Sequence, residues 1–196
     1  MEFCNKAEIE YRMFQYMVDD PTIYHTVYHT LDMIKLLDQL EQEVVSIDRC
    51  LYIKLYTAIC YHDAVYKTGA TNNEEKSAEL FVSDYGASLD PHFVTDVVQL
   101  ILATKLTFTE QQSDKIIGSK YIHDFDLSAF RSKEQILQNN IKLEKEAIGV
   151  YTHDQFVELT KKFFNNLLQK NIYWGPFACY NELAHQNIKE VMDQIK

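Results

Sequence analysis

The sequence predicts an all-α protein, a single-domain bundle of about seven to nine helices covering residues 1–196. Only five glycines and three prolines occur in 196 residues, so turn formers are scarce. Long segments are rich in Leu, Ile, Glu, Lys and Gln, which favour helices, and apolar residues recur at helical spacing. A chain of this length can bury a core without disulfides, and 13 Tyr and 11 Phe indicate an aromatic one.

The N-terminal half divides into five expected helices. The boundaries come from capping residues, from Pro and Gly, and from where the apolar spacing stops. In order, we expect a helix over 3–18 that stops at Asp20-Pro21, a second that continues to about Val44, a third capped by Ser46 or Asp48 that ends at His62-Asp63, a fourth from Glu74 to Tyr85 closed by Gly86, and a fifth from Asp90-Pro91 to about Thr104. The fifth is apolar on nearly all sides, which predicts a central, buried helix.

The C-terminal half is expected to support the bundle. Its segments are a loop over 106–112, a helix that begins at Ser113 and reaches Tyr121–Phe130, two amphipathic helices over 132–149 and 152–170, an aromatic break over 172–176, and a final helix from about Ala178 to Ile195. We find no internal repeat and no linker. One domain therefore accounts for the whole chain.

The net charge limits the classes of binding partner, and the cysteine content indicates the cellular compartment. A net charge of −10 excludes sequence-independent binding to duplex nucleic acid, which needs a basic face. Cys4, Cys50, Cys60 and Cys179 show no CxxC pairing, as is typical of reduced thiols in a cytosolic protein. No basic leader and no long uncharged run occur, so we expect a cytoplasmic protein that does not enter membranes. The sequence does not decide between a monomer and a homodimer.

The segment Ala58–Tyr66 contains the first candidate site. His62 and Asp63 interrupt an otherwise apolar helical run. Burying an imidazole beside a carboxylate is costly unless each has a partner, and a divalent metal suits both. The alternative is a helix end at which the two side chains face water.

Two further segments supply matching ligand types. His29 shares a helical stripe with Met33 and Leu36, so it faces inward, and His25 stands one turn before it. Asp126 is framed by apolar residues after His123-Asp124. The alternatives are a core histidine bonded to a backbone carbonyl and an aspartate that caps a helix.

The order H…HD…D resembles the HD superfamily of metal-dependent phosphohydrolases over nearly the full chain. The matching segments, within a little-characterised bacterial branch of predicted hydrolases, are Tyr24-His25-Thr26-xx-His29, Tyr61-His62-Asp63-Ala64-Val65-Tyr66, Asn73-Glu74-Glu75-Lys76-Ser77-Ala78, Asp124-Phe125-Asp126-Leu127-Ser128, Ile172-Tyr173 and Glu182-xxx-His185-xx-Ile188. The resemblance implies an HD/PDEase-like helical fold. It also implies four metal ligands, His29, His62, Asp63 and Asp126.

The resemblance further implies one divalent metal, with Mn, Fe, Co, Ni, Zn or Mg as candidates. Dinuclear members of the superfamily carry extra histidines where this chain has Asn73, Thr104 and Thr107. A metal-activated water would then attack a phosphate ester or anhydride, with Asp63 holding that water.

Four residues are the catalytic candidates beside the metal. They are Asp63, His25 and Glu74 for proton transfer or support of the ligands, and Lys105 as first choice for phosphate neutralisation. Lys67 and Lys142 are further candidates for that role, but each is better explained as a solvated surface lysine.

The expected function is hydrolysis of a small phosphorylated substrate, such as a nucleotide or phosphometabolite. A non-catalytic metal- or nucleotide-binding sensor with the same pocket is the first alternative. A helical interaction scaffold without any site is the second.

Overall fold

Helical periodicity and short connections produce an all-helical domain, as the sequence predicts. The computed structural model describes residues 5–19, 22–43 and 47–195, and within these ranges it has no strand. The helices there are α1 (Lys6–Asp19), α2 (Val27–Glu43), α3 (Arg49–Tyr61), α4 (Asn73–Tyr85), α5 (Pro91–Leu102), α6 (Glu110–Ser113), α7 (Ser119–Asp126), η1 (Ser128–Arg131), α8 (Lys133–Glu146), α9 (His153–Leu167), η2 (Ala178–Tyr180) and α10 (Asn181–Met192).

Local capping explains several helix starts. The Asp48 carboxylate accepts the backbone N–H of Leu51 at 2.9 Å, so Asp48 caps α3. Asp90 caps α5 in the same way, directly before Pro91. These two predictions are confirmed. The expected features at Asp20-Pro21, Val44 and Ser46 lie outside the described residues.

One expected helix is wrong in its bounds. The segment from Ser113 onward is not continuous helix, because the short α6 ends at Ser113 and α7 begins only at Ser119. Gly118, at the N-cap of α7, has φ +93°, which a helix interior does not allow. The short α6 brings the described α-helices to ten, just above the expected range.

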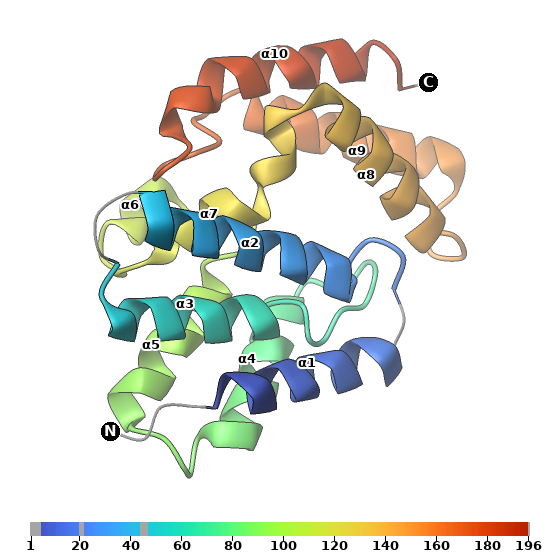
Figure 1. The fold of residues 1–196 in the computed structure, drawn as a ribbon. Helices are drawn as coiled ribbons and strands as arrows, with labels where there is room; N and C mark the ends of the chain where they lie inside the picture. The colour runs from blue at the N-terminus through green and yellow to red at the C-terminus, as the bar shows by residue number, and fades with distance from the viewer. Residues whose placement is uncertain (1–4, 20–21, 44–46, 196) are drawn as a thin grey trace.

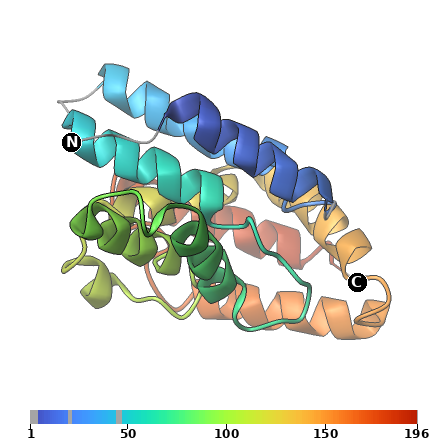
Figure 2. The same ribbon diagram turned by 90° about the horizontal axis from the view of Figure 1, so that it is seen from below.

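The helices pack around two hydrophobic clusters. The larger cluster is built by α1 to α5 with α7, and the smaller one by η1, α8, α9 and α10. Helices α1, α2 and α3 lie side by side in both views, with α4 and α5 across α3 from α2 (Figures 1 and 2). Helix α5 is buried on one face, at Phe93, Val97, Leu100 and Ile101, and exposed at Thr95 and Gln99, so the prediction that it is buried on nearly all sides is wrong.

The candidate ligands lie where the two clusters meet. Helix α2 carries His29, His62 and Asp63 directly follow α3, and Asp126 ends α7. Helix α7 contacts α2, α3, α5 and η1, so it joins the larger cluster to the smaller one. In the described part of the chain, no helix has the length and apolar character needed to cross a membrane.

Candidate metal centre

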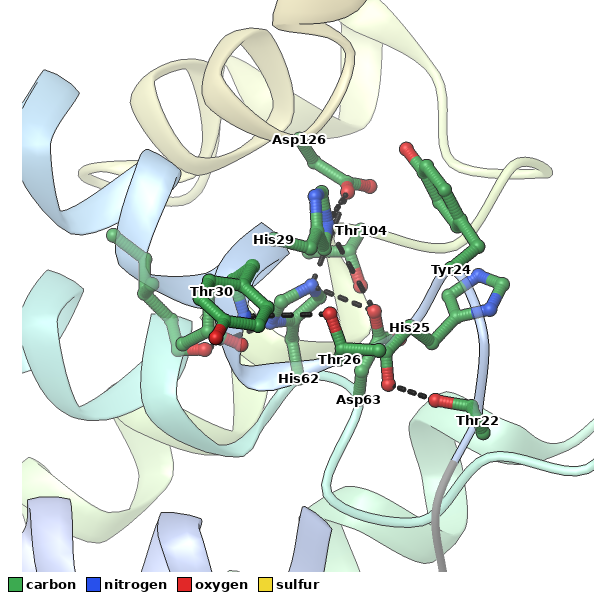
Figure 3. Close-up of polar contacts among 12 residues, drawn as sticks. Thr22, Tyr24, His25, Thr26, His29, Thr30, His62, Asp63, Thr104 and Asp126 are labelled. Atoms are coloured by element: carbon green, nitrogen blue, oxygen red, sulfur yellow. Dashed lines mark hydrogen bonds and ion pairs between the residues drawn. The ribbon is translucent and has the colours of Figure 1, made fainter. Parts of the chain in front are cut away.

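Four side chains from three separate segments point toward one another (Figure 3). They are the imidazoles of His29 and His62 and the carboxylates of Asp63 and Asp126. His29 lies on the first turn of α2, since the helix starts at Val27. It belongs to the apolar stripe of the helix, which faces inward. His62 is the C-terminal cap residue of α3, and its backbone N–H donates to the Ala58 carbonyl at 2.9 Å.

Each histidine nitrogen lies about 3 Å from one of the two carboxylates and about 4 Å from the other. His29 Nε2 lies 3.0 Å from Asp126 Oδ1 and 3.9 Å from Asp63 Oδ2. His62 Nε2 lies 3.0 Å from Asp63 Oδ2 and 3.9 Å from Asp126 Oδ1. With metal–ligand bonds of about 2.1 Å, neighbouring ligands at right angles lie about 3.0 Å apart and opposite ligands about 4.2 Å apart. The donor atoms of His29, His62 and Asp63 all lie within 4.8 Å of one another and can approach a single cation. Asp126 lies outside that group and is held beside it by its contact with His29 Nε2.

The orientation of His62 agrees with a ligand role. Its Nδ1–H donates to the backbone carbonyl of Ile59 at 2.8 Å, which leaves Nε2 as the atom directed at the cluster. The side chain is only 1% exposed, and among the described residues Nε2 has no hydrogen-bond partner despite the nearby carboxylate. A buried imidazole nitrogen without a partner is costly, and a metal ion would remove that cost.

The alternatives to a ligand role describe this geometry less well. His62 and Asp63 do not face water at a helix end, since the Asp63 side chain is only 14% exposed. His29 directs Nε2 to the Asp126 carboxylate instead of a backbone carbonyl. Asp126 stands at the C-terminal end of α7, where a carboxylate does not cap.

The electrostatics of the cluster favour a positive charge between its carboxylates. Burial lowers the pKa of His62, but Asp63 and Asp126 outweigh burial and raise that pKa to about 9. Burial raises the pKa of Asp63, yet the surrounding imidazoles bring it well below its usual range. A divalent cation satisfies this preference as well as a proton does.

His25 lies beside the cluster and is held by residues from distant segments. Its Nδ1 is 2.7 Å from Glu146 Oε1, and its ring stacks on Tyr66 with 3.4 Å between centroids. The other Glu146 oxygen accepts the backbone N–H groups of Ile23 and Tyr24 at 2.9 and 2.7 Å. Burial raises the pKa of Glu146, but these bonds and His25 lower it overall.

Glu146 is the functional candidate that the sequence reasoning missed. It occupies the last position of α8, 121 residues from His25, and nothing in its local pattern distinguishes it from other surface glutamates. Tyr66 ends the segment Tyr61–Tyr66, which contributes to the resemblance, but the sequence predicts no role for it. An acidic residue at the end of an amphipathic helix, where it opposes the helix dipole, is the one available signal.

Glu74 and the lysines occupy different places. Glu74 lines the cavity beside the cluster, and burial raises its pKa. Lys105 forms an ion pair with Glu75, which raises the pKa of Lys105, and it is not among the residues that line the cavity. Lys67 and Lys142 are exposed and also lie outside that lining. The expected role of Lys105 at a phosphate has no support from this position.

A cavity of about 480 Å³ opens beside the cluster, within the size range of small-molecule sites. Asp63, Asp126, His25 and Glu74 line one part of it, together with Asn73 and Thr104. Side chains of η1, α8 and α9 line much of the remainder, and most of these are apolar. Residues of the connecting loops, among them Leu106 and Tyr151, complete the lining.

The third acidic-histidine segment has mainly a structural role. His123 Nε2–H donates to the carbonyl of Ile172 at 3.1 Å, and its ring stacks on Trp174. Asp124 accepts the backbone N–H groups of Trp174, Gly175 and Phe177 at 2.9 to 3.0 Å. These contacts fix the segment before α10 to α7, so Asp126 is the residue of this motif that reaches the cluster.

The described residues contain one group of three donors, those of His29, His62 and Asp63, that all lie within 4.8 Å of one another. Asp126 is not part of this group, although its Oδ1 lies 3.0 Å from His29 Nε2 and 3.9 Å from His62 Nε2. The resemblance to the HD superfamily stays a prediction, because comparisons with protein families, with curated proteins and with solved structures found no match for this chain.

Proposed function

We propose that the protein is a metal-dependent phosphohydrolase that acts on a small phosphate ester or anhydride. One observation carries the proposal: the donor atoms of His29, His62 and Asp63 lie within 4.8 Å of one another beside a cavity, and Asp126 Oδ1 lies 3.0 Å from His29 Nε2. Mixed nitrogen and oxygen donors suit a divalent first-row metal. When bound, such an ion supplies Lewis-acid polarisation of a phosphoryl oxygen and lowers the pKa of a ligating water from about 15.7 toward roughly 7.

The side chains around the cluster provide the remaining functions. Asp63 has its second carboxylate oxygen available to orient the attacking water, as the resemblance implies. His25 faces the same cavity, and its Nδ1 contact with Glu146 fixes the ring, so its Nε2 is the atom free to exchange a proton with water or substrate. Glu74 lines the same cavity, and burial raises its pKa above the ordinary value, so it is a candidate for proton transfer at the leaving oxygen.

The experiment measures metal content and hydrolysis together. Protein prepared with Mn²⁺ is expected to retain about one equivalent by elemental analysis and to release phosphate from a panel of phosphomonoesters and nucleotides. Asp63→Ala removes a ligand, so it is expected to lose the metal and to reduce activity more than about 100-fold.

Asp32→Ala is the matched control. Asp32 lies on α2 near His29, but its side chain is 57% exposed and pairs with Lys35. This variant is expected to keep both metal and activity. Stoichiometric metal without turnover would favour the sensor alternative, and folded protein that takes up no metal would contradict the proposal.

A further inference from the structure

The cavity beside the candidate ligands has no lysine or arginine among its described lining residues. Its described lining contains four carboxylates, those of Asp63, Glu74, Asp126 and Glu146, and neither lysine nor arginine. A divalent ion would balance Asp63 and Asp126, and His25 pairs with Glu146. No side chain of the lining remains to neutralise anionic groups that a substrate carries away from the metal. A polyphosphate or a substrate with a second acidic group would therefore meet uncompensated negative charge.

Much of the remaining cavity wall is apolar, although Asn139, Asn140 and Thr160 also line it. Leu106, Leu143, Phe156 and Leu159 line the cavity, yet none of them belongs to either hydrophobic cluster. Leu106 and Leu159 are 56% and 44% exposed. Phe130, Phe163 and Phe164 of the smaller cluster complete the wall. Apolar side chains that face a cavity instead of a core are suited to cover an apolar group of a ligand.

From this wall we infer that the substrate is a phosphomonoester whose single anionic group is the phosphoryl group and whose remainder is an alkyl or aryl group. The inference rests on the proposed function and specifies its substrate class. The phosphoryl group would bind at the metal cluster, and the apolar group would lie between α8 and α9. In the hydrolysis, the water oxygen forms a new P–O bond and the ester P–O bond breaks. One proton of the water then goes to the released alcohol, and the other product is inorganic phosphate.

The test measures binding without turnover, so it does not depend on activity. Methyl-, butyl- and hexylphosphonate contain a P–C bond that cannot be hydrolysed as an ester, and their dissociation constants for the Mn²⁺-loaded protein are measured by calorimetry. We expect affinity to rise with chain length by up to about fourfold per methylene. A hexylphosphonate that carries a terminal carboxylate is expected to bind about tenfold or more weakly than hexylphosphonate.

A pair of substitutions on α8 locates the apolar group. Leu143→Gln places an amide in the cavity wall and is expected to weaken hexylphosphonate binding about tenfold, with little effect on methylphosphonate. Ile141→Gln is the control, since Ile141 is 53% exposed on the same helix and does not line the cavity. It is expected to leave both ligands unchanged. Far-UV circular dichroism and thermal melting check that both variants fold.

The outcomes separate the two proposals. Equal affinity for the three phosphonates, or an unchanged hexylphosphonate affinity in Leu143→Gln, overturns the inference while metal-dependent hydrolysis can still stand. Affinity that rises with chain length and falls in Leu143→Gln supports the inference, even if no ester in the panel is hydrolysed. Tighter binding of the carboxylate-bearing analogue than of hexylphosphonate would also overturn it.

Discussion

Two buried histidines show how the surroundings of a residue decide its role. His62 donates from Nδ1 to a backbone carbonyl and directs Nε2 at two carboxylates. His123 donates from Nε2 to Ile172 and stacks on Trp174. Carboxylates raise the pKa of His62, whereas burial lowers the pKa of His123 to about 4. Only His62 is therefore suited to bind a cation, although both lie in His-Asp dipeptides.

The lowered pKa of His123 predicts a loss of stability in mild acid. The unfolded state binds a proton at this group near pH 6.5, whereas the folded state binds it only near pH 4. Stability is therefore unaffected above about pH 7 and falls as the pH drops from 6.5 to 4, by about 2 kcal/mol at pH 5. His123→Gln is expected to lose less stability than the wild type between pH 7 and pH 5, by about that amount, in urea unfolding.

His92→Gln is the control for this prediction, because His92 is exposed at the start of α5. It is expected to retain the pH dependence of the wild type. The same pH dependence in His123→Gln as in the wild type would show that His123 is not the group responsible.

At the scale of elements, the joint between α6 and α7 sets the position of Asp126. Gly118 begins α7 with a positive φ, and a Cβ added there would lie 2.9 Å from Leu51 Cδ1 and 3.3 Å from Leu100 Cδ2. The glycine thus allows the start of α7 to approach α3 and α5 closely. Asp126 is the last residue of the short α7, so the position of this helix determines where the Asp126 carboxylate lies relative to His29 and His62.

Gly118→Ala is therefore expected to destabilise the protein by about 2 to 3 kcal/mol, from backbone strain and crowding together. Gly149→Ala separates the two causes, since Gly149 has φ +89° but an added Cβ would meet nothing within 4 Å. That variant is expected to lose only about 1 to 2 kcal/mol. Equal losses of unfolding free energy in the two variants would contradict a role for close packing at Gly118.

At the scale of the whole molecule, the four candidate ligands lie between the two hydrophobic clusters. They come from α2, from the end of α3 and from α7, so an ion bound by them would connect segments that are up to 97 residues apart in the chain. The cavity next to them has a polar side and a mostly apolar side, to which α8 and α9 contribute. Ion binding and packing of the two clusters are thus expected to be coupled.

This coupling predicts that metal raises the thermal stability. At a free Mn²⁺ concentration 100 times the dissociation constant, the gain is about 2.7 kcal/mol, which corresponds to roughly 5 to 10 °C for a domain of this size. Asp126→Asn is expected to lose most of this shift in thermal melting, whereas Asp32→Asn retains it. A shift of equal size in both variants would place the ion elsewhere.

The sequence by itself determined the features that depend on neighbouring residues. The helical class follows from composition and periodicity, and the Asp48 and Asp90 caps act on backbone groups within three residues. Local patterns pointed to His29, to His62-Asp63 and to the His123–Asp126 segment, and the resemblance to the HD superfamily selected His29, His62, Asp63 and Asp126 from them. The break between α6 and α7 was missed, because it lies at Gly118, where the chain passes close to Leu51 of α3 and Leu100 of α5, and these neighbours are distant in sequence.

Only the tertiary structure decided which distant side chains meet. Lys105 pairs with Glu75, Glu146 holds His25, and residues of α8 and α9 form an apolar wall without a basic group. Each of these contacts joins residues 30 or more positions apart, and the helices that carry them show ordinary amphipathic patterns. Local spacing identifies which face of a helix is buried, but the neighbour that covers it is chosen by the packing of the whole chain.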